Sequence, residues 1–290
     1  NENSNIKSVL TDHWKSLELL NKEHLNKYKT ICLLHSKEIN HEKGSSLNKR
    51  LIKSTDKANF IIANSNFTKE LAIKVGINSS KIKVIFPGVP KPKIIEDKFK
   101  TEAESILKDA FPKIITVARL EKRKSHDKIL MAIKNLKAKF PNIKYICIGF
   151  GKEENNLKKL SKELSIENEV IFLKNIDENL KLALIASSNL FLMPSRIDKK
   201  SVEGFGISFI EAASYGVGSI GGKDGGESDA IAHNKTGLIC DGNDLNSIYE
   251  AVNIFFTNDK FNEFGKAAQK FSENFHWNKI VKNYLKLINE

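Results

Sequence analysis

The sequence has little cysteine, no long apolar run and no Asp-x-Asp pair. Three cysteines among 290 residues, an odd number and widely spaced, argue against a disulfide framework or a cysteine metal site. No uninterrupted apolar run approaches the ~18 residues that a membrane-spanning helix needs. Without Asp-x-Asp, a metal-chelating carboxylate pair of that kind is missing. We therefore expect a reduced, cytosolic globular protein without a metal or cofactor.

Acidic residues are also in short supply, with 35 against 47 lysines and arginines, for a formal net charge of +12. Residues 1–100 hold 19 basic and 10 acidic residues, so most of the excess lies in this part of the chain. A basic region favours anionic partners, namely phosphates, nucleic acid or a negatively charged membrane face. A general compositional bias explains the charge equally well, because Lys, Asn and Ile are abundant throughout.

Short β-branched runs alternate with helical patterns along most of the chain. Nearly continuous apolar strands between amphipathic helices predict parallel sheets that are covered on both faces, a doubly wound α/β fold. We expect strands at 30–35, 58–65, 81–86, 113–118, 143–149, 169–174, 189–194 and 217–222, and helices that include 126–140 and 154–166.

A segment with three prolines and a charge cluster, residues 87–102, separates two strand-rich blocks. We predict a first lobe over 1–94, a second Rossmann-like lobe over 95–275, and a C-terminal helix over 276–290 that packs back toward the first lobe. The first lobe shows only three obvious strands. We expect it to be incomplete, with the sequence beginning partway through it.

Candidate binding residues follow two strands of the second lobe, where ligands of open α/β sheets sit. Arg119, Arg123 and Lys124 come just after the strand at 113–118. The turn Gly204–Phe205–Gly206 precedes a helix whose first amides, at Gly206, Ile207 and Ser208, would be unpaired and could bind an anion. Together with Arg119 and Lys124, this helix start suits a diphosphate.

Two glutamates flank this turn, Glu203 before it and Glu211 about one and a half turns into the helix. A carboxylate that accepts hydrogen bonds from adjacent hydroxyls is a common way to hold a ribose, a role that suits Glu211. Glu203 lies on the other side of the phosphates. The spacing is therefore consistent with a sugar nucleotide, one glutamate for each sugar.

Glu203-x7-Glu211 with its internal GFG resembles the family 4 retaining glycosyltransferases of GT-B architecture. The ordered segments VARLEKRKSHD (117–127), IANSNFTKELAIKVGI (62–77) and KDGGESDAIAHNKTGLI (223–239) carry the same resemblance. It implies two Rossmann-like lobes and a cytosolic enzyme that uses a UDP- or GDP-sugar, as the phosphatidylinositol mannosyltransferases do.

The resemblance implies specific roles for six residues. Arg119 and Lys124 would bind the diphosphate, Glu211 the ribose, Glu203 the donor sugar, the backbone near Ile176 the base, and His35 the sugar beside the reacting carbon. The chain departs from the family pattern at Ala118 and Ser125, which replace glycines, and at Ser228 and Asp229, which replace Pro-Glu. We leave Asp229 out of the site because its side chain is shorter.

The resulting function is hexose transfer from a nucleoside-diphosphate sugar to a saccharide or lipid-linked hydroxyl, in cell-envelope glycolipid, lipopolysaccharide or polysaccharide synthesis. The basic helix expected at 46–60 could lie on an anionic membrane at the inner face of the cell, or pack as an ordinary helix. The alternatives are a sugar-nucleotide epimerase of the same architecture and a non-catalytic basic nucleotide-binding protein. We expect no nucleic-acid partner, because no aromatic-interleaved basic patch is present.

Overall fold

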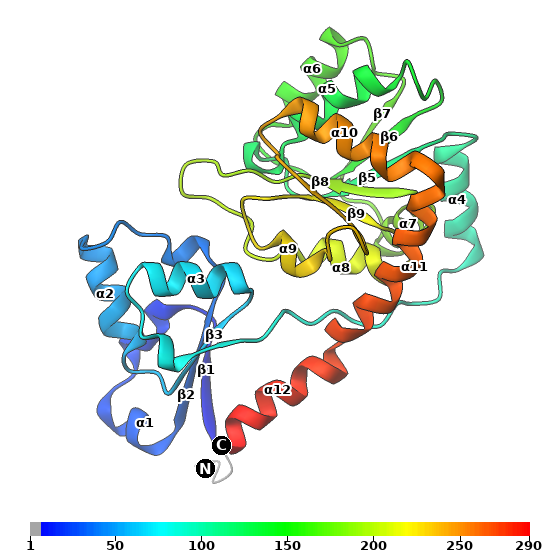
Figure 1. The fold of residues 1–290 in the computed structure, drawn as a ribbon. Coiled ribbons are helices and arrows are strands. Elements are labelled where there is room, and N and C mark those ends of the chain that lie inside the picture. The colour runs from blue at the N-terminus through cyan, green and yellow to red at the C-terminus, as the bar shows by residue number, and fades with distance from the viewer. Residues whose placement is uncertain (1–6) are drawn as a thin grey trace.

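The computed structural model describes residues 7–290 and contains two parallel β-sheets that lie in separate lobes (Figure 1). Four strands form the first sheet in the order β1-β2-β3-β4, and six form the second in the order β10-β9-β8-β5-β6-β7. All pairings within these two sheets are parallel. The doubly wound α/β prediction is therefore confirmed.

The first lobe begins with the strand at the edge of its sheet and alternates strands with short helices. Its strands are β1 (Ser8–Thr11), β2 (Lys29–Leu34), β3 (Phe60–Ala63) and β4 (Ile82–Val84), its α-helices are α1 (Lys22–Lys27), α2 (Ser46–Thr55) and α3 (Asn66–Lys74), and its 3-10 helices are η1 (Trp14–Leu19), η2 (Lys37–Ile39) and η3 (Ser79–Lys81).

The second lobe holds the larger sheet and the remaining helices. Its strands are β5 (Lys113–Val117), β6 (Lys144–Ile148), β7 (Val170–Leu173), β8 (Leu190–Met193), β9 (Ser219–Gly222) and β10 (Gly237–Cys240); its α-helices are α4 (Asp97–Leu107), α5 (His126–Leu136), α6 (Glu154–Glu163), α7 (Glu178–Ala186), α8 (Ile207–Ser214), α9 (Glu227–Ala230), α10 (Leu245–Phe256) and α11 (Lys260–Ser272), followed by α12 (Trp277–Asn289); η4 (Lys122–Lys124), η5 (Thr257–Asp259) and η6 (Glu273–Phe275) are 3-10 helices.

Each face of the second sheet carries its own apolar cluster. On one face Ile129 of α5 and Phe255 of α10 are fully buried, and on the other Leu107 of α4, Leu184 of α7 and Phe209 of α8 are fully buried. Burial on both faces explains why the strands read as continuous apolar runs. It also leaves the carboxyl ends of β5, β6 and β8 as the places where polar segments can gather.

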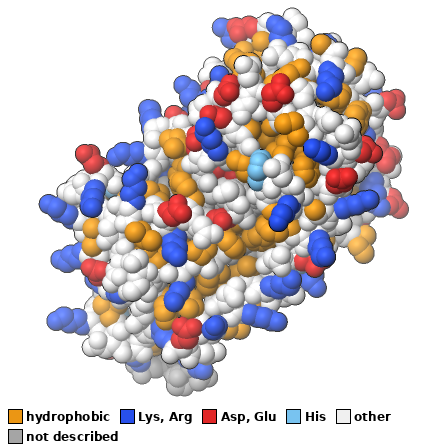
Figure 2. All heavy atoms as spheres, viewed as in Figure 1, with side chains coloured by type: hydrophobic (Ala, Val, Ile, Leu, Met, Phe, Trp, Pro, Cys, Tyr) orange, Lys and Arg blue, Asp and Glu red, His pale blue; other side chains and the backbone are white. Residues whose placement is uncertain are grey.

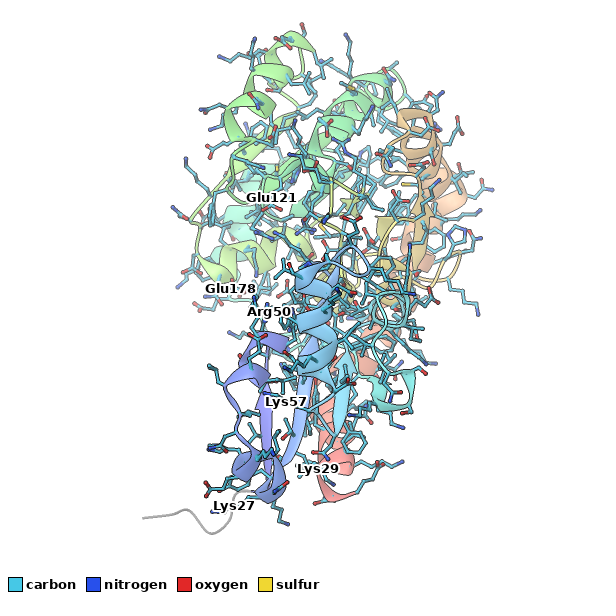
Figure 3. The ribbon with its side chains drawn as sticks, turned by 90° about the vertical axis from the view of Figure 1, so that its left-hand side faces the viewer. Lys27, Lys29, Arg50, Lys57, Glu121 and Glu178 are labelled. Carbon is cyan, nitrogen blue, oxygen red and sulfur yellow. The ribbon has the colours of Figure 1, made fainter. Side chains whose placement is uncertain are left out.

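The first sheet is covered on one face by its own helices and on the other by the C-terminal helix α12. Leu51 of α2 and Ile61 of β3 lie in the cluster on the first face, whereas Ile280 and Leu287 of α12 pack with Ile31 of β2 on the other face. In Figures 1 and 3, α12 runs from the second lobe to the far end of the first. The first lobe therefore takes part of its core from the end of the chain.

Lys29 fixes the end of α12. Its ammonium group donates to the carbonyl oxygens of Leu287 at 3.3 Å and Ile288 at 3.2 Å, and Figure 3 shows Lys29 beside that helix end. These carbonyls belong to the last turn, where a helix has no internal donors and favours a positive charge.

The chain passes between the lobes twice, and the two passages are hydrogen-bonded to each other. The segment 85–96 leads from β4 to α4, and the amide of Val89 donates to the carbonyl of Phe275 at 2.8 Å. The amide of Trp277 in turn donates to the carbonyl of Val89 at 3.1 Å, forming a short parallel bridge. The connection between the lobes is thus a paired one.

Two strands were not predicted from the sequence, β1 and β10. Each has four residues; β1 is an edge strand and β10 begins with a glycine, so neither shows a long apolar run. The first sheet consequently has four strands rather than three. The division of the chain at residue 94 stays a prediction.

The basic helix expected at 46–60 is shorter in the structure and packs against the lobe. Leu51 of α2 is fully buried, and Arg50 pairs with Glu18 at 2.8 Å. Lysines and arginines are spread over both lobes on the face in Figure 2 and form no single patch there. Across residues 7–290, no helix has both the length and the apolar character needed to cross a membrane.

We predict that Ile280→Ala lowers the free energy of unfolding by about 2–4 kcal/mol, because Ile280 is 3% exposed and its loss leaves a cavity against the first sheet. Val281→Ala is the matched control on the same helix, since Val281 is 45% exposed. Thermal and urea denaturation measure both variants. Equal destabilisation by the two substitutions would contradict the packing of α12 described here.

Candidate active site

A cavity of about 440 Å³ lies between the lobes at the carboxyl ends of the strands. Its walls come from the first lobe, the passage between the lobes, and two loops of the second lobe. The lining residues are His35, Lys37, Asn64, Pro87, Arg119, Arg123, Ser201, Val202, Glu203, Gly204, Phe205, Gly206, Ile207 and Ser208. The cavity therefore brings together residues that are up to 173 positions apart, from His35 to Ser208.

An alternating chain of charges forms the floor of this cavity. Arg119 pairs with Glu121 at 2.9 Å, and Glu121 also pairs with Arg123 at 3.1 Å. Arg123 reaches Glu203 at 2.8 Å, and the ammonium group of Lys124 contacts the same Glu203 oxygen. Three cations thus share two carboxylates, which leaves a net positive charge at the floor.

The buried members of this charge chain, Arg123, Lys124 and Glu203, depend on one another for charge compensation. The side chains of Arg123, Lys124 and Glu203 are 10%, 8% and 14% exposed. Burial by itself raises the pKa of Glu203, but Lys124 and Arg123 outweigh it, so the pKa lies below its ordinary value. Burial lowers the pKa of Lys124, against the attraction of Glu203.

The helix α8 begins directly at the cavity. Gly206 precedes it with a φ of 92°, in the left-handed region that glycine adopts readily, and Ile207 is the first helical residue. The first amides of a helix have no partner within it, and here they belong to residues that line the cavity. An anion placed there would meet both these amides and the net positive floor.

The lobes touch closely at this turn. A Cβ atom on Gly204 would lie 2.6 Å from the carbonyl oxygen of His35 and 2.7 Å from the hydroxyl of Ser36, so no larger residue fits without a shift. Ser36 itself has a φ of 86°. The position of the turn is therefore set by the first lobe as well as by the second.

His35 stands at the end of β2 and is held from two sides. Its Nε2 atom lies 2.9 Å from a carboxylate oxygen of Asp12, which follows the neighbouring strand β1. Its backbone amide donates to Glu38 at 2.6 Å. The imidazole is thus placed at the first-lobe wall of the cavity, with one ring nitrogen bound to Asp12.

Two of the sequence-predicted site residues, Ile176 and Glu211, line separate cavities. Ile176 lines an adjoining cavity of about 250 Å³, which shares Arg119 with the main one. Glu211 lines a small cavity of about 80 Å³ together with Glu178. Burial raises the pKa of Glu211, with Lys181 acting in the opposite direction.

The distribution of the predicted residues is therefore uneven. The main cavity collects His35, Arg119, Glu203, Gly204, Phe205, Gly206, Ile207 and Ser208, and Lys124 lies directly beneath it in contact with Glu203. The sequence places Arg123 after the same strand, but Arg123 was given no role in the site, although it stands between the two chosen cations. Lys37, Asn64 and Asp12 were also missed in the sequence. They follow three different strands of the first sheet, and only the folded structure shows that these strand ends meet at the cavity.

The departures from the family pattern have structural counterparts. Ser125, in place of a glycine, has a φ of 57°, a conformation that glycine adopts without strain. Asp229 lies at the contact between the lobes: it accepts from the backbone amide of Asn66 at 2.6 Å and from its side chain at 2.8 Å. The shorter acid thus binds the start of α3 in the first lobe.

Comparison with known proteins gives the family. Residues 97–274 match the family described as glycosyl transferases group 1, which is more than half of the chain. The chain belongs to this family. Its match to the family includes α8, both glutamates and the whole floor of the cavity.

Two relatives within the family are mannosyltransferases by name. The chain is 26% identical over 236 residues to the GDP-mannose-dependent alpha-(1-6)-phosphatidylinositol monomannoside mannosyltransferase of Mycobacterium tuberculosis, covering 78% of this chain and 59% of the relative. It is 30% identical over 173 residues to the GDP-mannose-dependent monoacylated alpha-(1-6)-phosphatidylinositol monomannoside mannosyltransferase of Corynebacterium glutamicum. This match covers 59% of this chain and 43% of the relative. The chain thus spans less than two thirds of the length of these relatives.

A solved structure of similar fold is that of Anabaena Alr3699/HepE in complex with UDP and glucose. It has a TM-score of 0.81 and 18% sequence identity, and the match covers 98% of this chain and 78% of that one. The protein described here therefore has the two-lobed GT-B architecture, as predicted.

The buried charge chain predicts how stability changes with pH. Glu203→Gln removes one partner of a buried ion pair and should lower the free energy of unfolding by about 3–5 kcal/mol at pH 7. Because the folded pKa of Glu203 is lowered, its contribution is present above the unfolded pKa and is lost as pH falls through the folded value. Thermal unfolding from pH 7 to pH 3 should show the difference between the variant and the parent protein shrinking below about pH 4.

Glu178→Gln serves as the control, because Glu178 pairs with Lys181 at 2.7 Å but is 61% exposed. Its effect should stay below about 1 kcal/mol at every pH. A difference for Glu203→Gln that is small, or that does not change with pH, would contradict a buried ion pair.

Proposed function

We propose that the protein transfers a hexose from a UDP- or GDP-sugar to a hydroxyl acceptor, with retention at the anomeric carbon. The observation that carries the proposal is the start of α8 at a cleft whose floor bears a net positive charge. Membership of the glycosyl transferases group 1 family supports the reaction class. The names of the mycobacterial and corynebacterial relatives support a nucleotide-sugar donor.

In the proposed complex, the diphosphate lies over the first turn of α8 beside Arg119. The amides of Ile207 and Ser208 and the guanidinium of Arg119 would stabilise the negative charge that develops on the departing diphosphate. Lys124 would act from beneath, where its charge is shared with Glu203. These groups supply the charge neutralisation, so we propose that transfer needs no divalent metal.

The nucleoside would extend into the cavity that contains Ile176. This cavity shares Arg119 with the main one, so a ligand whose diphosphate contacts Arg119 can place its base there. We propose that Ile176 contacts the base. Glu211 would bind the ribose, although its own cavity is a separate one.

The donor sugar would lie between Glu203 and His35, on opposite lobes. Glu203 is held by two cations, which fixes its orientation, and His35 is held through Asp12. A polar wall on each side can orient the sugar as its positive charge develops, so that acceptor and anomeric carbon meet in a productive geometry.

We propose an acceptor in cell-envelope glycolipid, polysaccharide or lipopolysaccharide synthesis, and a location at the inner face of the cell membrane. The relatives named for phosphatidylinositol mannosides and a 28% identical protein in a Klebsiella pneumoniae cps region support this choice. The acceptor would enter from the first lobe, over residues 1–94, beside Lys37 and Asn64.

We predict that Arg119→Ala weakens binding of UDP or GDP at least tenfold and leaves binding of uridine or guanosine nearly unchanged, because only the diphosphate carries the charge that Arg119 meets. Lys122→Ala is the matched control, an exposed cation three residues away that does not line the main cavity. Calorimetric titration with and without EDTA measures both. Equal losses for the two variants, or binding that requires Mg²⁺ or Mn²⁺, would count against the proposal.

Glu211→Gln tests the proposed ribose contact. Loss of a charged acceptor should weaken binding of the nucleoside diphosphate by about 1–3 kcal/mol. Glu178→Gln, in the same small cavity but on α7, should leave this affinity unchanged. If Glu211→Gln binds UDP and GDP as the parent protein does, Glu211 lies outside the donor site.

A further inference from the structure

A carboxylic acid is buried without a partner beneath the proposed donor site. Glu227, the first residue of α9, is fully buried, and neither of its carboxyl oxygens has a hydrogen-bond partner within residues 7–290. An ionised carboxylate in such a place is strongly destabilising unless a cation or several donors contact it. The burial of Glu227 therefore requires an explanation of its role and of how the fold remains stable with it.

The surroundings of Glu227 connect it to the charge chain. A Cβ atom on Gly225 would lie 2.6 Å from the Oε2 atom of Glu227 and 2.5 Å from the carbonyl oxygen of Glu203. The amide of Gly226 donates to that same carbonyl at 2.9 Å. Glu227 thus lies directly behind the loop that carries Glu203.

The charged and titratable groups that face Glu227 come from several elements. Glu203 on the turn before α8 and Lys124 on η4 act on it from the cavity side, and the thiol of Cys240 faces it from β10. The Ser195 hydroxyl after β8 is close by but makes no hydrogen bond. On α9 itself, Asp229 is bound to Asn66.

Within residues 7–290, Lys124 is the cation that acts on Glu227, and its contacts are with other residues. Its ammonium group touches Glu203 and lies 3.2 Å from the sulfur of Met193. No ion pair joins Lys124 to Glu227 in the described part of the chain. Of the two acids that could hold Lys124, the structure assigns it to Glu203.

We propose that Glu227 is a positioning residue of the donor site that keeps its proton at neutral pH, and so leaves Lys124 bound to Glu203. The neutral acid preserves the single excess positive charge carried by Arg119, Arg123 and Lys124 over Glu121 and Glu203. Loss of the proton would cancel that charge and attract Lys124 away from Glu203.

The direction of the titration agrees with this assignment. Burial raises the pKa of Glu227 well above its ordinary value, Glu203 raises it further, and the attraction of Lys124 offsets only part of the effect. When folding raises the pKa of an acid, the free energy of unfolding falls as the pH rises from the pKa of the unfolded state to the pKa of the folded state. Glu227→Gln, the neutral isostere, should therefore gain stability over the parent protein as pH rises.

The inference rests on the proposed function only where it concerns donor binding. An ionised Glu227 behind the Glu203 loop should repel the diphosphate. A separation of about 10 Å at an effective dielectric constant near 20 corresponds to a loss of about tenfold in sugar-nucleotide affinity. Glu227→Gln should bind at pH 6 within about twofold of the parent protein and keep that affinity at pH 8.5, whereas the parent protein weakens.

The first measurement is independent of nucleotide binding. An infrared difference spectrum of the parent protein minus Glu227→Gln at pH 7 should show the carbonyl band of a protonated carboxyl group. Melting temperatures of the two proteins from pH 5 to pH 8.5 should diverge in favour of the variant. A carboxylate band in place of the protonated one, or a constant difference in melting temperature, would overturn the proposal.

The second measurement is calorimetric titration of UDP-glucose and GDP-mannose over the same range, because their diphosphate bridge keeps its charge as pH changes. The expected result is a ratio of dissociation constants, parent over variant, that rises with pH. A ratio that stays constant, or a variant that binds more weakly at every pH, would overturn the positioning role. No binding by the folded parent protein at any pH would count against the proposed function instead, and the infrared result would still stand.

Discussion

The contact between Glu203 and its two cations is the interaction on which the cleft depends. Three charges that are nearly removed from water stay there only because each has an oppositely charged partner in contact. The carbonyl of Arg123 accepts from the amide of Arg196, and the carbonyl of Glu203 accepts from that of Gly226. The loops after β5, β8 and β9 are therefore fixed to one another around these charges, and α8 begins where this arrangement holds its first residues.

The same loops also form the boundary between the lobes. Gly204 lies against the backbone of His35, and Asp229 binds the start of α3 through Asn66. The residues that shape the floor of the cleft are thus within a few positions of those that touch the first lobe. A shift of the turn at Gly204 cannot leave the wall formed by His35 unchanged.

Sequence patterns predicted the sheets better than they predicted the site. Continuous apolar runs identify strands buried on both faces, which is why eight of the ten strands, all except β1 and β10, were expected. The position of α8 followed from the glycine turn before it.

Arg123 could not be singled out, because a lysine-rich segment does not show which cation points inward. The burial of Arg123 depends on Glu203, 80 positions away. Glu211 and Ile176 illustrate the same limit, since helix geometry places them on α8 and after β7 but does not say which cavity each one lines.

The burial of Glu227 was not predictable for a related reason. Its neighbours in the sequence, Gly226 and Ser228, suggest an exposed turn, and only the packing of α9 behind the Glu203 loop removes it from water. The family resemblance pointed attention to Asp229 instead, the acid that occupies the usual position in the motif.

The paired passage at Val89 has a mechanical consequence. The two segments that connect the lobes are hydrogen-bonded to each other at Val89, so neither segment can shift there without the other. We therefore expect the lobes to move relative to each other by rotation about Val89 rather than by translation. The hydrogen bonds between Asn66, at the start of α3, and Asp229 of α9 join the lobes at a second place. Rotation of the lobes about the Val89 bridge would therefore have to break the bonds between Asn66 and Asp229, whereas α12, which packs on the first sheet through Ile280 and Leu287, can move together with the first lobe.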